Sequence, residues 1–484
     1  MERPEDFSLT QNAGLVGASK FVNILGLLAA SVILTRLLSR SEYGNYEQVW
    51  LVYNSFLPLA GYGLSSSIYY YSAREEKRSV YSSAVAGITI VGVLVGIVLA
   101  VFAPLIAHWF GADALTKYIR IFAVYAILSA PSLMFETIFV TERRVGLLLW
   151  GNLVLTVLFA SSILAAALVF RSLTIVFVSI AVVGAVKSAY LLFYLFHNGK
   201  LRLGKLSPAL KAQFLYALPI LIGGIAGTIS KVVDRYLVAF FFTPDKFAVY
   251  AIGSKELPMI AVITGSASAV LFPVFSELGS KEMRGKFIEI WNNSISKTGL
   301  FLLPLMVFLL FAANDFMSFF FGPKYVVSAG IFRIFLLLLP LRLSFYGQAL
   351  FSLGKQKFYM YTSIAEMFLS GVVSYFLLRL YGLEGAAIGK VIVTYVQVVV
   401  LLGLLMVLLK SNVVEMFPWT KMFKLILISA VGLVPLVFIR GMFGNVYMRF
   451  VVEFVVFGVI FGGIALATKS VRIVNIRKMR FVVN

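Results

Sequence analysis

Fourteen apolar runs, each long enough to cross a lipid bilayer, constrain this chain more than any other feature of its sequence. A bilayer-spanning helix needs about 20 apolar residues, whereas a barrel strand needs only about 10. The 484 residues are 61% hydrophobic and 13% charged, unlike a soluble protein. The sequence therefore predicts an all-α integral membrane protein with about 14 transmembrane helices and little mass outside the membrane. The runs lie at about 14–38, 46–71, 80–107, 118–140, 146–170, 173–196, 214–242, 247–275, 297–313, 326–351, 358–380, 383–409, 422–440 and 447–468.

Basic residues alternate between the segments that join these runs. With the N-terminus inside, 24 of the 42 Lys and Arg residues fall in cytoplasmic segments, 10 in outer segments and the other 8 within spans. Cytoplasmic loops of membrane proteins carry an excess of Lys and Arg. We therefore expect both termini in the cytoplasm. The net charge of +21 then reflects membrane topology and contact with anionic lipids, and no nucleic-acid partner is expected.

A weak internal repeat predicts two lobes. EYGNYEQ follows the first run and KFAVYAI follows the seventh, and each precedes a Leu-Pro pair. GAVKSAY and AIGKVIV place one lysine in the sixth and twelfth runs, so six spans separate each pair and the halves share one orientation. Such parallel lobes hold the substrate site at their interface. We expect an N-terminal lobe at 1–197, a cytoplasmic linker at 198–213, a C-terminal lobe at 214–409, and two appended spans with a basic tail at 410–484.

The seventh run carries three charges within five residues: Lys231, Asp234 and Arg235. An ionisable side chain near the bilayer centre costs about 2.5 kcal/mol or more unless it faces protein or water. Lys231 and Arg235 share a helix face, and Asp234 can pair with Lys231, which leaves Arg235 as surplus positive charge. Two interpretations stay open: an ion pair that locks this helix to a neighbour, or a water-filled cavity that selects anions. We favour the cavity.

Other bases also lie inside the predicted spans. Lys187, Lys231 and Arg342 are the deepest, roughly 13 Å or more from the nearest span end, which makes snorkelling to the interface difficult. Pro340, beside Arg342, predicts a kink that is either static or a hinge. The remaining bases lie nearer the span ends, where snorkelling explains them as well as function does.

A cavity with surplus Lys and Arg favours an anionic substrate, and guanidinium groups suit phosphate or pyrophosphate. Polyprenyl-pyrophosphate carriers of bacterial and archaeal surface glycans have such a headgroup, which indicates movement of this lipid from the inner to the outer leaflet. The chain has no cysteine, and its histidines, His108 and His197, lie at segment ends, so no metal site is expected. It also lacks the G-x-x-x-x-G-K-[ST] loop of nucleotide-hydrolysing proteins.

Four stretches resemble polysaccharide flippases, the Wzx-type transporters of the multidrug/oligosaccharidyl-lipid/polysaccharide exporter superfamily. They are ILTRLLSRSEYGNYEQVW, LPLAGYGLSSSIYYY, VVDRYLVAFFFTPDKFAVYAIGSKE and YGLEGAAIGKVI. The resemblance implies two six-helix lobes, a cationic central cavity and rocking between inward- and outward-open states, usually coupled to a proton or sodium gradient. It also implies the plasma (inner) membrane of a bacterium or archaeon.

Carried over residue by residue, the resemblance assigns the family's Asp-Arg pair to Asp234 and Arg235 and its first-span base to Lys20. The ion-coupling candidates are Asp234 and then Glu366, with H+ or Na+ as the coupling ion and no other cofactor. The expected partners are a polyprenyl-pyrophosphate-linked glycan, membrane lipids and other polysaccharide-assembly membrane proteins. The candidate substrate-binding residues are Lys20, Lys187, Lys231, Arg235, Arg342 and Lys390.

Three alternatives stay open. A drug/cation antiporter of the same superfamily typically has twelve spans and an acidic pocket, unlike the basic interior predicted here. A lipid II flippase shares fourteen spans and a cationic cavity, although the EYGNYEQ stretch favours the polysaccharide branch. A glycan polymerase would need a large outer loop with catalytic groups, whereas the outer segments here hold at most about a dozen residues, so we expect no enzyme activity.

Overall fold

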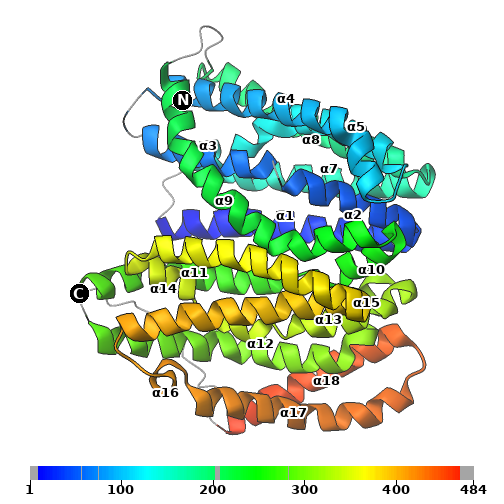
Figure 1. The fold of residues 1–484 in the computed structure, drawn as a ribbon, viewed down its shortest axis with the longest axis vertical. Helices are drawn as coiled ribbons and strands as arrows, with labels where there is room; N and C mark the ends of the chain where they lie inside the picture. The colour runs from blue at the N-terminus through cyan, green and yellow to red at the C-terminus, as the bar shows by residue number, and fades with distance from the viewer. Residues whose placement is uncertain are drawn as a thin grey trace. The chain divides into compact units, whose positions relative to one another are not determined.

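The computed structural model describes residues 9–55, 57–72, 74, 76–201, 208–281 and 283–468, and all regular structure within them is helical (Figure 1). The elements are α1 (Leu9–Leu37), α2 (Arg40–Asn54), α3 (Leu57–Tyr71), α4 (Lys77–Trp109), α5 (Leu115–Ser129), η1 (Ala130–Met134), α6 (Phe135–Thr141), α7 (Val145–Val169), α8 (Leu173–His197), α9 (Pro208–Phe241), α10 (Pro244–Gly253), α11 (Pro258–Ser280), α12 (Arg284–Phe321), η2 (Pro323–Ser328), α13 (Ala329–Leu336), η3 (Leu339–Leu343), α14 (Tyr346–Ser352), α15 (Gln356–Leu408), α16 (Val413–Met416), α17 (Trp419–Met442) and α18 (Val446–Ala467).

The predicted all-helical, multi-span fold is confirmed. Among the described residues, ten helices are long and apolar enough to cross a membrane, or eleven spans if the pair Pro323–Leu336 and Leu339–Ser352, bent by 48°, counts as one. The bend lies next to Pro340, the residue from which the sequence predicts a kink.

Three regions of the chain account for the difference between the fourteen predicted spans and the eleven in the described part of the structure. The 53 residues of α15 would form a helix of about 80 Å, more than twice the hydrocarbon thickness, and they include both 358–380 and 383–409. Helix α15 breaks at Gly382, where φ is +62°. The run 46–71 is divided between α2 and α3, of 15 residues each. The seventh run lies in α9, which has 34 residues but is not among the ten.

The chain forms two compact units. The first contains Met1–Ile252 and Ser363–Lys390, and the second contains Gly253–Thr362 and Val391–Asn484. The lobes predicted from the sequence are the parts expected to move during transport, which is a different definition from compactness, so their boundaries stay a prediction.

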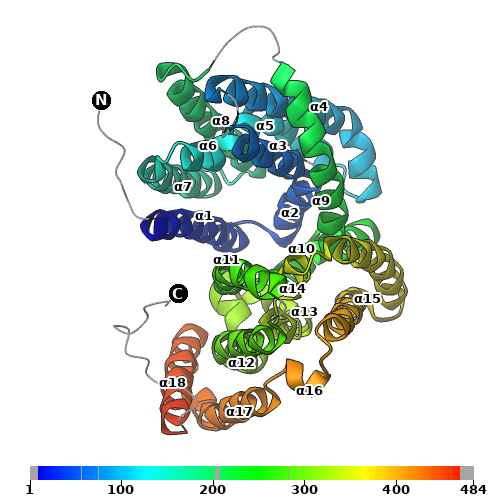
Figure 2. The same ribbon diagram turned by 90° about the vertical axis from the view of Figure 1, so that its left-hand side faces the viewer.

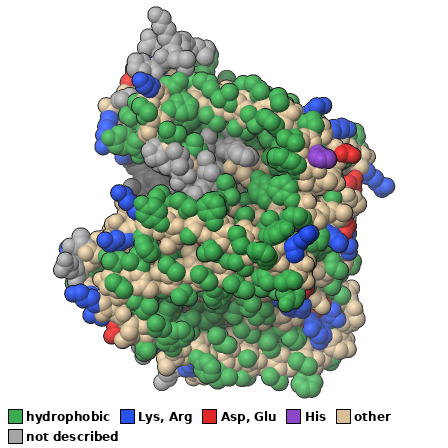
Figure 3. Space-filling model, in the orientation of Figure 1, with side chains coloured by type: hydrophobic (Ala, Val, Ile, Leu, Met, Phe, Trp, Pro, Cys, Tyr) green, Lys and Arg blue, Asp and Glu red, His purple; other side chains and the backbone are tan. Residues whose placement is uncertain are grey.

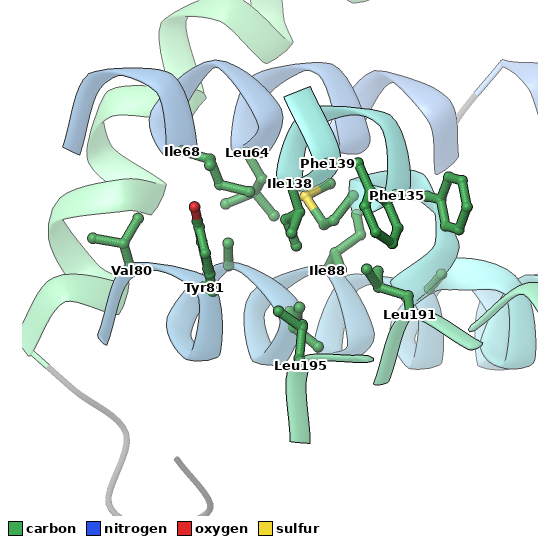
Figure 4. Close-up of a cluster of buried hydrophobic side chains, with 14 of the residues drawn as sticks. Leu64, Ile68, Val80, Tyr81, Ile88, Phe135, Ile138, Phe139, Leu191 and Leu195 are labelled. Atoms are coloured by element: carbon green, nitrogen blue, oxygen red, sulfur yellow. The ribbon is translucent and has the colours of Figure 1, made fainter. Parts of the chain in front are cut away.

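Buried apolar side chains hold the first unit together. Figure 4 shows Leu64 and Ile68 of α3 near Tyr81 and Ile88 of α4, with the side chains of α6 and α8 beside them. Helix α4 also packs along α5, α1 along α7, and α8 along α5. The α4–α5 contact depends on glycine, because a Cβ on Gly96 would lie 2.5 Å from Cγ1 of Ile127. Interior packing at this density leaves little room for rearrangement within the unit.

In the second unit, α12 packs against α11, α17 and α18, as Figure 2 shows end-on for α17 and α18. A charge network joins these helices. Arg440 of α17 and Arg449 of α18 both pair with Asp315 of α12, Arg440 at 2.5 Å. Nε of Arg440 also lies 3.4 Å from Glu453, whose side chain is fully buried. The sequence did not predict this network, which ties the two appended helices to α12.

The outer face of the helices is apolar. In Figure 3, hydrophobic side chains cover the middle of the helices, and Lys and Arg gather toward the helix ends. Val101, Phe193 and Phe438 are 66%, 66% and 74% exposed. Large apolar side chains that are this exposed are expected where lipid rather than water surrounds the helices.

Candidate functional site

One of the predicted substrate lysines pairs with a carboxylate in the first unit, and a second lies over the neighbouring aromatic ring. Lys20 of α1 forms an ion pair with Glu136 of α6, with 2.9 Å between Nζ and Oε1. Lys187 of α8 lies over the ring of Phe135, with Nζ 5.0 Å from the ring centroid, and is close enough to Glu136 for their charges to interact. The Lys20 and Glu136 side chains are 58% and 42% exposed, so the pair is open to a ligand.

The position of Lys187 follows from how α8 packs on α5. A Cβ on Gly184 would lie 2.6 Å from Cε2 of Tyr125, so glycine allows close approach here. One turn further, the hydroxyl of Ser188 accepts a hydrogen bond from the backbone N–H of Ser132 at 3.2 Å. With Gly184 and Ser188 facing inward, the intervening helix geometry directs Lys187 toward η1 and α6.

Polar contacts between α1 and α7 fix the face of α1 that presents Lys20. Nδ2 of Asn152 donates to Oγ of Ser19 at 2.6 Å, and one turn along α1 the hydroxyl of Thr156 donates to Oδ1 of Asn23 at 3.0 Å. Ser19 and Asn152 are buried, so these bonds have little competition from solvent. Since Lys20 follows Ser19 directly, its side chain lies beside the buried face and reaches Glu136.

The three charged groups lie within one half of their helices. The apolar span of α1 begins at Leu15, and the span containing α6 ends at Thr141, which places Lys20 and Glu136 each about 8 Å from a span end. Lys187 lies about 15 Å from the end of α8 at His197. In the predicted topology all three ends are cytoplasmic.

Aromatic side chains of α3 lie in the same unit. Tyr69 is 49% exposed and interacts with Thr137, the residue after Glu136. The next residue, Tyr70, stacks on Tyr216 of α9 with ring centroids 4.9 Å apart, and the Arg74 guanidinium lies 3.9 Å from the Tyr70 centroid. Exposed phenol rings provide both stacking surfaces and hydroxyl groups, which suits sugar recognition. The sequence alone did not single out these tyrosines.

The charges of the seventh run separate in the structure. Asp234 is 2% exposed, and its carboxylate accepts a hydrogen bond from the Tyr250 hydroxyl at 2.6 Å. The predicted Lys231–Asp234 pairing is not formed among the described residues: Lys231 is exposed, while Asp234 turns toward α10. Arg235 is partly buried on the same helix.

Lys390 and Glu366, predicted to have separate roles, form one buried pair. Nζ of Lys390 lies 2.9 Å from Oε1 of Glu366, with side chains 8% and 10% exposed. Ser230 of α9 completes the group, because its carbonyl accepts from Lys390 at 2.7 Å and its hydroxyl donates to Glu366 at 2.6 Å. The two charges balance each other, and the pair is nearly closed to solvent.

The break in α15 makes this pairing possible. After Gly382 the chain turns back, and a Cβ on Gly389 would lie 2.6 Å from Cα of Ser374. This close contact brings Lys390 beside Glu366, which is 24 residues earlier in the chain.

Arg342, the last predicted substrate residue, lies in the second unit. It pairs with Glu256 at 3.3 Å, and both side chains are about half exposed, at 51% and 47%. Of the six predicted bases, the structure thus joins Lys20 and Lys187 at one site and pairs Arg342 and Lys390 with separate carboxylates. The substrate and coupling roles of these residues stay predictions.

Glu136 and Tyr69 are the residues of this site that the sequence did not select. Glu136 was one of several acids within spans, and its i,i+4 neighbours carry no charge that would single it out. Within the described chain, no group of three or more His, Cys, Asp or Glu residues could hold a metal ion.

Comparison with known proteins agrees with this architecture. A family model described as "Polysaccharide biosynthesis protein" matches residues 33–330. A putative O-antigen transporter of Shigella flexneri is 24% identical over 187 residues, covering 37% of this chain and 43% of that protein. The chain spans about half the length of the curated relatives it matches.

Two solved structures share the fold. The lipid II flippase MurJ in an inward closed conformation superposes with a TM-score of 0.70 at 17% identity, covering 93% of this chain and 98% of MurJ. An inward-facing transporter of the multidrug-resistance MATE family superposes with a TM-score of 0.66 at 16% identity, covering 80% and 95% of the two chains. The family match covers more than half of the chain. The chain therefore belongs to the polysaccharide biosynthesis protein family, and it has the multi-span helical fold of MurJ and of the MATE-family transporter.

Proposed function

We propose that this protein moves a polyprenyl-pyrophosphate-linked oligosaccharide from the inner to the outer leaflet of the plasma membrane. The observation that carries the proposal is the half-exposed Lys20–Glu136 ion pair within membrane-spanning helices, with Lys187 over the ring of the neighbouring Phe135. Charged side chains within membrane spans are rare and usually pair with one another or face a water-filled cavity, which makes this group a candidate ligand site. A surplus of one positive charge beside aromatic side chains suits a headgroup that is both anionic and sugar-bearing.

The position of the group suits loading from the cytoplasmic side. Lys20 and Lys187 would bind the two phosphates, since ammonium groups are strong donors to phosphate oxygens. Tyr69, half exposed beside Thr137, would contact the first sugar. Rocking of two lobes between inward- and outward-open states, driven by an H+ or Na+ gradient, would then carry the headgroup across. The relative from Shigella flexneri, named as a putative O-antigen transporter, supports this substrate class.

Translocation of a labelled polyprenyl-pyrophosphate oligosaccharide in proteoliposomes tests the proposal. We expect transport by the unaltered protein and at least about a tenfold loss in Lys187→Met. Lys281→Met is the matched control, because Lys281 lies in an exposed i,i+4 pair with Glu277 at 2.6 Å in the second unit. Equal transport by Lys187→Met and Lys281→Met would refute the role of Lys187.

The transported substrate distinguishes this proposal from two alternatives, a lipid II flippase and a drug/cation antiporter. Transport of lipid II in preference to the polysaccharide precursor would assign the protein to peptidoglycan synthesis, whose flippase MurJ shares its fold. Efflux of a cationic dye without lipid transport would assign it to drug export.

A further inference from the structure

One ion pair joins two interruptions of the helical chain in the second unit. Residues 254–257, which connect α10 to α11, are not helical, and Glu256 lies among them. The other interruption is the 48° bend between Leu336 and Leu339, and Arg342 lies in η3, directly after it. Nη2 of Arg342 lies 3.3 Å from the Glu256 carboxylate, so the two interruptions are side by side.

The pair lies deep in the membrane. Arg342 is about 15 Å from the end of its span at Ser352, which is half the thickness of the hydrocarbon core. Non-helical backbone at this depth is tolerated only where protein buries it or where it lines water. The side chains of Arg342 and Glu256 are 51% and 47% exposed, and exposed charges within spans usually face a water-filled cavity. We therefore expect both side chains to face water rather than lipid.

The bend beside Arg342 is held by a side chain of another helix. The carbonyl of Leu337 lacks its usual helical partner, because the N–H of Leu341 bonds to Leu338 at 3.1 Å instead. The hydroxyl of Tyr395 on α15 donates to this free carbonyl at 2.7 Å. This contact places a phenol ring beside the bend, where it offers a surface on which a sugar ring can stack.

The contact between Arg342 and Glu256 is loose. Nη2 lies at the same distance, 3.3 Å, from both carboxylate oxygens, whereas charge-assisted hydrogen bonds are usually about 2.7–2.9 Å long. Among the described residues, neither side chain forms another hydrogen bond. A guanidinium has several N–H donors and a carboxylate has several acceptor positions, so most of this capacity is left for a ligand.

The charge of the pair favours an uncharged ligand. A phosphate that approached Arg342 would meet the negative carboxylate of Glu256 beside it, and the pair itself has no net charge to attract an anion. The preceding Lys255 is partly buried and has contacts of its own. A sugar hydroxyl, in contrast, both donates and accepts, so neighbouring hydroxyls can use the guanidinium and the carboxylate together.

From this arrangement we propose that Glu256 and Arg342 form a glycan subsite, which binds the hydroxyl groups of an uncharged sugar in the lipid-linked oligosaccharide. This inference rests on the proposed function. It also changes the role predicted for Arg342 from the sequence, because the paired carboxylate makes this guanidinium better suited to sugar than to pyrophosphate. Hydrogen bonds to charged groups are stronger than those between neutral groups, so a single sugar would contribute measurably to affinity.

Binding measurements in phosphatidylcholine nanodiscs test the proposal with two probes, a polyprenyl pyrophosphate and the same lipid carrying an uncharged oligosaccharide. We expect the unaltered protein to bind the glycosylated lipid more tightly. The double variant Glu256→Gln/Arg342→Met removes both charges and leaves neither unpaired. It should weaken binding of the glycosylated lipid by about tenfold or more and leave binding of the bare pyrophosphate lipid unchanged. Glu277→Gln/Lys281→Met, which alters an exposed ion pair of the same unit in the same way, should change neither affinity.

The single variant Glu256→Gln separates sugar from phosphate at this site. It leaves Arg342 as an unpaired positive charge, so a gain in affinity for the bare pyrophosphate lipid would show that phosphate occupies the site and would overturn the proposal. Equal losses for both lipids in the folded double variant, or no loss for either, would also overturn the glycan subsite while leaving the proposed function intact. Failure of the unaltered protein to bind either lipid would overturn the proposed function itself.

Discussion

Replacing Lys390 with methionine should destabilise the protein strongly, although the sequence predicts a role for this residue in substrate binding. The Lys390 ammonium contacts Glu366 at 2.9 Å and the Ser230 carbonyl at 2.7 Å, and the Lys390 and Glu366 side chains are about nine-tenths buried. Methionine has a similar length and fits an apolar site, so the change removes the charge with little change in volume.

The expected loss of stability depends on which member of the ion pair remains in the protein. A buried pair contributes little net stability, because desolvation offsets the attraction, but removing one partner leaves a buried charge and costs about 3–5 kcal/mol. Solvent screening cannot reduce this much at 8% and 10% exposure. The double variant Lys390→Met/Glu366→Gln removes both charges. The Ser230 hydroxyl, which donates to the Glu366 carboxylate, can still donate to the amide oxygen of the substituted side chain, so most of the loss should be recovered.

Reversible unfolding in mixed detergent micelles measures these differences. The expected order of stability is the unaltered protein and the double variant close together, with Lys390→Met well below both. Lys281→Met controls for the same substitution at an exposed pair and should unfold like the unaltered protein. If Lys390→Met is as stable as the unaltered protein but loses ligand binding, the reasoning is wrong and Lys390 serves the substrate.

Other predictions concern the charged residues and the appended helices. Arg235→Ala should abolish transport while abundance in the membrane stays nearly unchanged; failure to accumulate would instead indicate a structural ion pair. Asp315→Asn should increase hydrogen exchange in α17 and α18, because it weakens the carboxylate that holds Arg440 and Arg449 on α12, and unchanged exchange would contradict this. Removing 410–484 should reduce transport less than loss of either lobe. The truncated protein should also carry Asp315→Asn, because without Arg440 and Arg449 the buried aspartate would lose its partners and destabilise α12. Loss of all transport in a truncated protein that still folds would refute the secondary role of this region.

The charge network on Asp315 changes how the last two helices are understood. The repeat pattern treats 410–484 as an appendage outside the two predicted lobes. Arg440 and Arg449 nevertheless reach a 3% exposed aspartate on α12, and Glu453 is fully buried beside them. The appended helices are therefore part of the packed second unit, whatever their share in transport.

The class of fold and the family can be read from the sequence alone. Long apolar runs leave no structure other than membrane-spanning helices, because lipid offers backbone groups no hydrogen-bond partner. The stretches around EYGNYEQ and VVDRYL lie within the region matched by the family model. Helix ends were harder to place: α15 crosses two predicted runs without a loop, since a single glycine with positive φ reverses the chain.

Which charges meet depends on the tertiary packing. Periodicity places Lys231 and Asp234 on one helix face, yet Asp234 bonds Tyr250 of α10. Lys390 pairs with Glu366 because α15 turns back at Gly382, and Glu136 contacts Lys20 from a helix more than a hundred residues away in the chain. An ionic contact acts over a few ångströms between groups distant in sequence, and helix packing brings those groups together. Hydrophobicity sets where helices form, whereas the pairing of their few charges is settled by how they pack.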